Sequence, residues 1–378
     1  MSARGRAAAR AAAVAAALAA LALAGGCGEK IAIPEAEGLF GFREYRVFQT
    51  LTEDDPRQLI QLQGAVFVLT ADALVKRTTI LEETGRAAGL ADPTALCSGP
   101  GDSLIFVWEQ GTRTVSWFQR SDLQRAGSTV LAEPVRVVAM AASTRGAGTA
   151  AGAESFLYLS DPDAGVVRRY AFDYYGGLTP YGLLARSDGA SVRYVLEPAG
   201  LATDPQEHLL VCDADTSRNW VIRFDPAPDE TDEDLRGVAA LFDPVPRCAP
   251  VPAANEYALG NAPPCPPDEW FPGPSDSTGF FRAPQAVAVD GAGRIFVADT
   301  GNDRIQIFGA DGTHDLTFGG AENSPGPTSI AVFDFRTGFD RTMHGALVYV
   351  VLPEQGRIRS FISSEYDESL NRPPRPPE

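Results

Sequence analysis

The feature that most constrains this chain is a repeated pattern of short apolar segments that are separated by turns and led by prolines. Its clearest example is the segment 283–308, in which three alternating or apolar runs are joined by a Gly-containing turn and a polar turn. The second run ends at Asp299, and a weaker fourth run follows at 316–318. Alternation over four to eight residues, bounded by turn residues, is typical of short antiparallel β-strands.

Weaker copies of this unit occur along most of the chain. Six prolines lead the copies: Pro56, Pro93, Pro134, Pro198, Pro284 and Pro327. Their spacings are 37, 41, 64, 86 and 43 residues, so three fit one four-stranded unit and two contain insertions. In the third unit we expect the first strand at 135–139. Six units of this length predict an all-β fold, a six-bladed β-propeller.

The segment 283–308 also resembles the NHL repeat. The residues that carry the resemblance are Pro284, Ala288-Val289-Asp290, Val297-Ala298-Asp299, Asn302, Arg304, Gln306 and Phe308. The resemblance implies a propeller of the NHL/TolB-like type and, for function, mainly the binding of a ligand or a protein on one face of the ring. Because fold alone does not set chemistry, no reaction follows from it.

The two ends of the repeat region predict how the ring closes. After Ile362 the chain has only residues 363–378, which are rich in proline and leave no room for another strand. Before the first unit, residues 44–51 alternate like a strand. We therefore expect 44–51 to be the outer strand of the last blade, since an open ring would leave exposed strand edges.

The N-terminus predicts export. The first 26 residues contain 14 alanines and no acidic residue, and Arg4, Arg6 and Arg10 precede an apolar run at 11–24. A positive start followed by a short apolar run is typical of a secretory signal peptide. The run is too short for a helix that crosses the roughly 30 Å of a bilayer.

Residues 23–27 resemble a bacterial lipobox, although Ala24 occupies the position where leucine is usual. The resemblance implies a lipidated Cys27 and, because Gly28 rather than Asp follows it, the outer membrane of a Gram-negative bacterium. An ordinary signal peptide is the alternative. The expected organisation is a signal peptide at 1–26, a tether at 27–43, a propeller at 44–362 and a Pro-rich tail at 363–378.

The net charge of the chain indicates which partners it can bind, and the positions of its cysteines indicate which of them form a disulfide. The chain has 49 Asp and Glu against 32 Lys and Arg, and removal of 1–26 brings the net charge to about −20, which opposes nucleic acid binding. In an oxidising compartment we expect a disulfide between Cys248 and Cys265, which flank a Pro-rich loop. Cys97 and Cys212 lie in strand-like apolar runs and are predicted to be small buried residues.

The candidate binding face combines turn residues with the Pro-rich insertion 243–282, because both are expected on the same face of the ring. The residues expected there are Asp161, Asp213, Asp299, Asn302, Tyr257, Trp270 and Phe271. The alternative is structural, because Asp and Asn cap tight turns through nearby backbone N–H groups and aromatic residues pack an insertion onto a ring. Residues 143–154 and 336–345 are expected to be loops on the opposite face.

No catalytic, cofactor-binding or metal-ligating residue is predicted. The pairs Asp161/Asp163 and Asp213/Asp215 look like Ca²⁺ ligands but lack the twelve-residue loop with its bidentate Glu, so Ca²⁺ stays an alternative. A second alternative is a metal-dependent hydrolase similar to the gluconolactonase-like propellers, which hold a divalent metal in the central channel. The residues expected near this channel are Gln58, Thr94, Arg136, Gln285 and Thr328, a set poor in carboxylates.

These patterns lead to one functional expectation. The mature protein is expected to be a non-enzymatic lipoprotein of the cell envelope, held at the membrane through Cys27. Its propeller face is expected to bind a protein or a small ligand.

Overall fold

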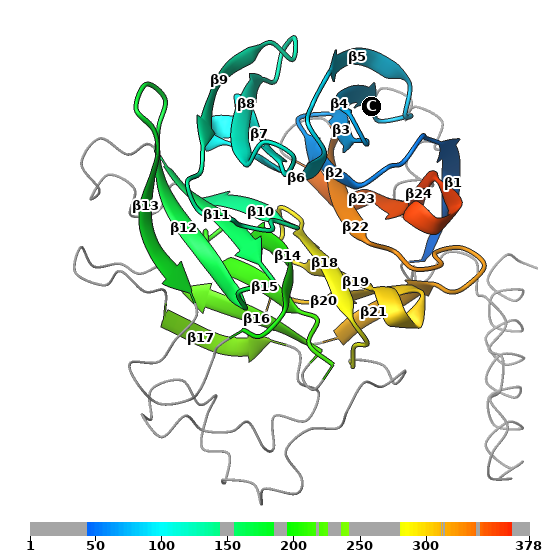
Figure 1. The fold of residues 1–378 in the computed structure, drawn as a ribbon. Coiled ribbons are helices and arrows are strands. Elements are labelled where there is room, and N and C mark those ends of the chain that lie inside the picture. The colour runs from blue at the N-terminus through cyan, green and yellow to red at the C-terminus, as the bar shows by residue number, and fades with distance from the viewer. Residues whose placement is uncertain are drawn as a thin grey trace, which may run out of the picture. The chain divides into compact units, whose positions relative to one another are not determined.

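The strands of this protein are arranged as separate four-stranded sheets around a common axis (Figure 1). The computed structural model describes residues 44–364 apart from 144–154, 185–194, 217–218, 226–235, 242–279, 311, 313 and 338–340. Within these residues six such sheets form, and each is antiparallel throughout. Each sheet is one blade, and the prediction of a six-bladed, all-β propeller is confirmed.

The first three blades follow the proline-led units. Blade 1 contains β2 (Gln58–Leu62), β3 (Ala65–Leu69), β4 (Ala73–Thr78) and β5 (Glu83–Ala88). Blade 2 contains β6 (Pro93–Ser98), β7 (Leu104–Glu109), β8 (Thr114–Gln119) and β9 (Arg125–Val130). Blade 3 contains β10 (Met140–Ser143), β11 (Ser155–Asp161), β12 (Val166–Asp173) and β13 (Gly177–Leu184).

The remaining blades complete the ring. Blade 4 contains β14 (Pro198–Thr203), β15 (Leu209–Asp213), β16 (Trp220–Asp225) and β17 (Arg236–Leu241). Blade 5 contains β18 (Pro284–Val289), β19 (Ile295–Asp299), β20 (Arg304–Phe308) and β21 (His314–Gly319). Blade 6 contains β22 (Ser329–Thr337), β23 (Arg341–Leu352), β24 (Arg357–Ser363) and β1 (Tyr45–Thr52). Short 3₁₀ turns are η1 (Pro100–Asp102), η5 (Thr300–Asn302) and η6 (Pro353–Gln355).

The ring is closed by the N-terminal strand, as predicted. β1 pairs with β24 from Tyr45↔Ser363 to Thr52↔Arg357, with a bulge at Phe48. In Figure 1 the dark blue β1 accordingly lies beside the red β24. The last blade is thus built from both ends of the repeat region, which ties its outer edge to the rest of the ring.

The hydrophobic core lies between the blades rather than inside any one of them. Six clusters of buried residues each combine side chains from two neighbouring blades, and together they run around the ring. The second strand of a blade is packed on both faces, so β7, β11, β15 and β19 are buried along their whole length. This explains why these strands have nearly continuous apolar sequences.

Two sequence expectations about strands are corrected. The segment 135–139 has the buried alternation of a strand, but the inner strand of blade 3 begins only at Met140. The backbone N–H of Ala139 donates instead to Ser160 Oγ at 2.8 Å, so a side chain replaces the ladder partner. The segment 336–345 was expected to be a loop, whereas β22 extends into it as far as Thr337 and β23 begins at Arg341, and these two residues are paired.

The predictions for the cysteines can be checked only in part. Cys97 and Cys212 are free, buried thiols, as expected. Cys27, Cys248 and Cys265 lie outside the described residues, as do the loop 144–154 and most of 243–282. In the described part of the chain, no helix has the length and hydropathy needed to cross a bilayer.

Candidate functional site

The aspartate that ends the second strand of blade 5 is a structural centre of the NHL-like unit. Asp299 is fully buried. It accepts hydrogen bonds from the Arg282 N–H at 2.7 Å, Asn302 Nδ2 at 2.9 Å, Arg304 Nε at 2.7 Å and Gln306 Nε2 at 3.0 Å. Burial raises the pKa of Asp299, and the bonds from Arg282, Asn302 and Arg304 oppose that shift. These contacts explain why the repeat pattern contains Asp, Asn, Arg and Gln at these positions.

The carboxylates at the equivalent positions of blades 4 and 2 also accept hydrogen bonds from backbone N–H groups. Asp213 accepts the N–H groups of Leu196 at 3.0 Å and Glu197 at 2.9 Å, just before the inner strand of its own blade. Glu109 accepts the Ala91 N–H at 2.9 Å and is paired with Arg125 at 2.9 Å. In blades 2, 4 and 5 the carboxylate therefore ties the approach to the first strand to the end of the second.

Asp161 has a related arrangement in blade 3. It accepts the Ala164 N–H at 3.3 Å and pairs with Arg168 at 2.9 Å, while its side chain is only 3% exposed. The three aspartates expected at a binding face are therefore buried, and their contacts fulfil the structural alternative. Asn302 is half-buried and bonded to Asp299. Tyr257, Trp270 and Phe271, which complete the expected face, lie outside the described residues.

The end of the Pro-rich insertion is attached to this same face. The Phe280 carbonyl accepts Arg304 Nη2 at 2.9 Å and Gln306 Nε2 at 2.7 Å. The Gly301 N–H, in the turn after β19, donates to the Arg282 carbonyl at 2.8 Å. Residues 280–282 thus lie against the turn between β19 and β20. Residues 243–279 of the insertion lie outside the described residues.

The Asp pairs considered for Ca²⁺ do not converge as ligands. Asp163 is directed to Arg136, with Nη1 and Oδ1 3.1 Å apart, and both side chains are exposed. The Asp215 N–H donates to Asp213 at 3.3 Å, so that contact belongs to the turn. Across the described ranges, no group of three or more His, Cys, Asp or Glu side chains is arranged to hold a metal ion.

A cavity of about 190 Å³ lies where the six inner strands meet. All six contribute to its wall, and every described residue in that wall is uncharged. Gln58 lines the cavity as expected, whereas Thr94, Arg136, Gln285 and Thr328 do not. Hard divalent cations require oxygen ligands that include carboxylates. The donor set of this wall therefore does not fit the metal site of the hydrolase alternative.

Polar side chains near this cavity connect one inner strand to the next, a role that sequence reasoning missed. Gln58 Oε1 accepts the Leu96 N–H of blade 2 at 2.6 Å. Thr203 Oγ1 of blade 4 donates to the Ala142 carbonyl of blade 3 at 3.2 Å. Inner strands of different blades do not pair with one another, so these side chains satisfy backbone groups that a ladder would otherwise satisfy.

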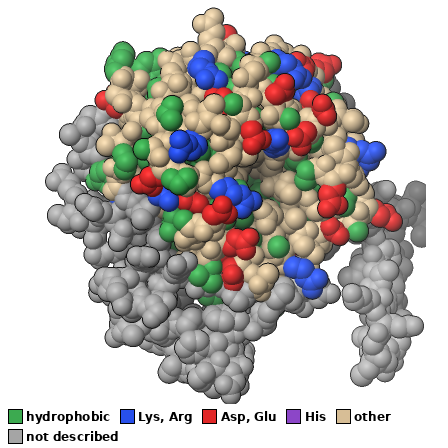
Figure 2. All heavy atoms as spheres, viewed as in Figure 1, with side chains coloured by type: hydrophobic (Ala, Val, Ile, Leu, Met, Phe, Trp, Pro, Cys, Tyr) green, Lys and Arg blue, Asp and Glu red, His purple; other side chains and the backbone are tan. Residues whose placement is uncertain are grey.

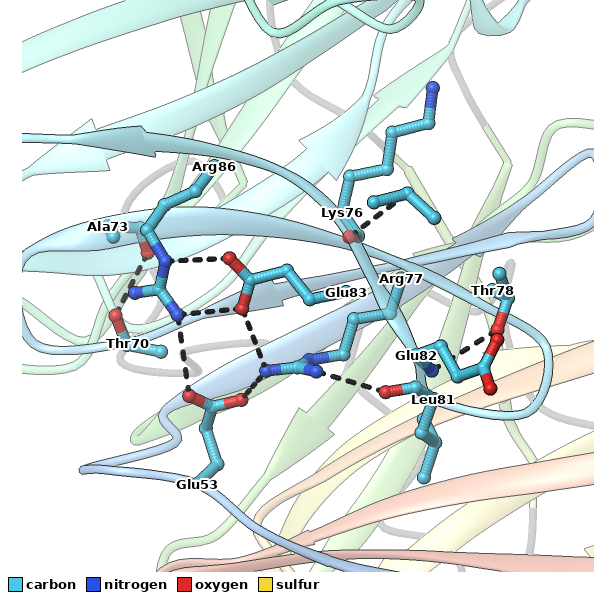
Figure 3. Close-up of polar contacts among 11 residues, drawn as sticks. Glu53, Thr70, Ala73, Lys76, Arg77, Thr78, Leu81, Glu82, Glu83 and Arg86 are labelled. Carbon is cyan, nitrogen blue, oxygen red and sulfur yellow. Dashed lines mark hydrogen bonds and ion pairs between the residues drawn. The ribbon is translucent and has the colours of Figure 1, made fainter.

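A charged network joins the closing strand to blade 1 (Figure 3). Glu53, directly after β1, pairs with Arg77 of β4, and both side chains are 8% exposed. Arg77 also donates to the Leu81 carbonyl at 2.9 Å and pairs with Glu83 at 3.4 Å. Arg86 lies 3.0 Å from Glu83, and its hydrogen bond holds the pKa of Glu83 below the usual value. The network crosses the seam of the ring and has no signal in the sequence.

Charge on the outer surface is mixed. Figure 2 shows acidic and basic side chains interspersed over the face that it presents, so the described residues of this face create no field of one sign. The net negative charge of the chain is therefore not gathered into a single patch there.

The family model named NHL repeat matches residues 281–308. No curated protein matches the chain in sequence. A protein of unknown function from Bacteroides thetaiotaomicron has a TM-score of 0.50 at 13% identity, over 85% of this chain and 72% of that chain.

Two enzymes are also similar in structure. A gluconolactonase from Xanthomonas campestris has a TM-score of 0.49 at 12% identity, over 84% of this chain and 94% of that chain. Virginiamycin B lyase from Staphylococcus aureus has a TM-score of 0.48 at 10% identity, over 84% and 99%. Similarity at such identities concerns the fold, and function has to come from the site. The chain is a six-bladed β-propeller whose fifth blade carries an NHL repeat.

Proposed function

We propose that this protein is an exported, lipid-anchored binding module of the cell envelope, without an enzymatic role. In this proposal Cys27 is lipidated and holds the ring at the outer membrane. The face that carries the turn between β19 and β20, together with the insertion 243–282, contacts a protein or another ligand.

The observation that carries the proposal is the attachment of residues 280–282 to the NHL-like turn. Two hydrogen bonds to the Phe280 carbonyl and one from the Arg282 N–H fix the end of the insertion on a rigid part of blade 5. Binding residues are commonly held on loops that a rigid scaffold positions. The buried carboxylates support this proposal. Their contacts stabilise the scaffold, so the residues that contact a partner are expected in the loops.

A loop exchange tests the assignment of the face. Residues 243–279 are replaced by a short Gly/Ser segment, and 280–283 are kept because they are bonded to blade 5. The matched control replaces 144–154, which was expected on the opposite face. Proteins crosslinked to the full-length chain in the envelope are then identified. The proposal expects a partner that wild type and control capture and the first variant loses. Equal capture by all three proteins contradicts it.

Two further measurements test the lipid anchor and the hydrolase alternative. Cys27→Ala is expected to abolish incorporation of labelled fatty acid, and continued labelling would refute the lipid anchor. Metal analysis of the purified protein addresses the enzyme. One Ca²⁺ or Zn²⁺ per chain, with a higher melting temperature, would overturn the non-enzymatic role.

A further inference from the structure

The central cavity has no role in the proposed function. It is lined by all six inner strands: β2, β6, β10, β14, β18 and β22. Its volume of about 190 Å³ exceeds the roughly 150 Å³ of an engineered apolar cavity that holds benzene. A molecule with one six-membered ring and a few substituents matches this size.

The wall disfavours a charged occupant. The described lining residues include no Asp, Glu, Lys, Arg or His. A charge that loses part of its hydration on entering a cavity needs an opposite charge or several hydrogen bonds to compensate for that loss. With no counter-charge in the wall, a neutral molecule is preferred over an anion or a cation of the same shape.

The wall also offers apolar contact from five of the six blades. Five half-buried apolar side chains from five different blades line it: Ile60, Ala142, Ala202, Ala288 and Val332. Three of the five are alanines, in blades 3, 4 and 5. A larger side chain at any of these alanines would occupy space that is now open.

Hydrogen bonding is the second component of the wall. In the sheets formed by the described residues, each inner strand is paired on one side only. An unpaired strand edge presents backbone N–H and C=O groups. Gln61, Ser98, Thr203 and Ser329 add uncharged polar side chains to the wall. Thr203 and Ser329 already bond to backbone groups of neighbouring blades. A hydroxyl oxygen has two lone pairs, so these side chains can accept a further hydrogen bond from an occupant that carries a donor.

We propose that the central cavity binds a neutral molecule, about one six-membered ring in size, that combines apolar surface with hydrogen-bonding groups. This site is separate from the contact face of the proposed function, because it lies among the inner strands and not on the turns between β19 and β20.

Three ring compounds that differ in charge test the proposal: cyclohexanol, cyclohexylammonium and cyclohexanecarboxylate. Binding to the full chain is measured by ligand-detected saturation-transfer NMR with titration. Cyclohexanol is expected to bind saturably and at least tenfold more tightly than either ion. No saturable binding of cyclohexanol, or equal binding of all three compounds, would overturn the proposal.

Variants that fill the cavity test whether cyclohexanol binds there. Ala202→Leu and Ala288→Leu, in different blades, each fill part of the cavity and are expected to weaken cyclohexanol binding at least tenfold. The matched control is Ala292→Leu in the exposed turn between β18 and β19, which should leave the affinity unchanged. Affinities unaffected by the cavity variants, in folded protein, would show that cyclohexanol binds elsewhere and would contradict the proposal.

A measurement on the unmodified chain covers the case in which neither variant folds. Ile60 and Val332 line the cavity, whereas Val47 is exposed on the closing strand. In methyl-labelled protein, saturating cyclohexanol is expected to shift the methyl signals of Ile60 and Val332 and to leave those of Val47 unchanged. Unchanged signals of Ile60 and Val332 would refute occupancy of the cavity.

Discussion

Tyr45 provides a direct test of how the N-terminal strand closes the ring. Its ring stacks on Phe318 with centroids 4.6 Å apart, and its hydroxyl donates to the Gly345 carbonyl at 2.7 Å. Removing a fully buried aromatic side chain costs about 3–5 kcal/mol, and roughly half of this applies to a half-buried one. The hydrogen bond adds about 1 kcal/mol. We therefore expect Tyr45→Ala to lower the free energy of unfolding by about 3 kcal/mol.

Two companion variants make this test specific. Tyr45→Phe keeps the stacked ring and removes only the hydrogen bond, so a loss of about 1 kcal/mol is expected. Phe48→Ala lies at the bulge of the same strand, is 41% exposed, and should change stability by less than about 0.5 kcal/mol. Equilibrium urea unfolding, followed by circular dichroism, gives the three values. The reasoning fails if Tyr45→Ala costs no more than Phe48→Ala.

Three other predictions concern charged and titratable groups. Arg77→Ala leaves the buried Glu53 without its ion pair and should lower the free energy of unfolding in urea by about 3 kcal/mol. Arg86 is 40% exposed, so Arg86→Ala should cost less than about 1 kcal/mol. Equal losses for the two variants would contradict the network. Asp299→Ala leaves several buried donors without their acceptor and should lower the free energy of unfolding by about 2–3 kcal/mol in the same assay. An unchanged free energy of unfolding would refute the structural role of Asp299. Burial lowers the pKa of His314 from 6.5, so the folded protein binds this proton less readily than the unfolded chain. Stability is then fully present above pH 6.5 and declines as the pH falls below it; His314→Gln should flatten that decline in thermal melts, and an unchanged slope would argue against it.

Much of the strand order could be predicted because each blade repeats a local pattern. The NHL-like unit was expected from alternation and turn residues, and β18 to β20 follow it closely. The closing strand was expected at 44–51 and is found at Tyr45–Thr52. Prediction failed where apolar alternation exists without a ladder, as at 135–139. It also failed where a hairpin extends beyond its apolar part, as at 336–345.

The candidate site was less predictable from the sequence. The pattern marks Asp299 as important, but a carboxylate at the end of a strand serves equally well for binding and for capping a turn. Only burial and the Arg282, Arg304 and Gln306 contacts decide that it stabilises the fold. Of the residues expected near the channel, Gln58 alone lines the cavity, because the depth of each inner strand relative to its neighbours is set by packing between blades.

The sequence by itself determined the number of blades, the strand pattern within each and the strand that closes the ring. These follow from short-range alternation, turn chemistry and the spacing of six prolines, all of which are local properties. The tertiary structure decided the burial of the aspartates, the Glu53–Arg77 pair and the neutral wall of the cavity. The Glu53–Arg77 pair and the cavity wall join residues from different blades and exist only once the blades have packed into a ring. The aspartates bond within their own blades, and their contacts form only when the turns fold.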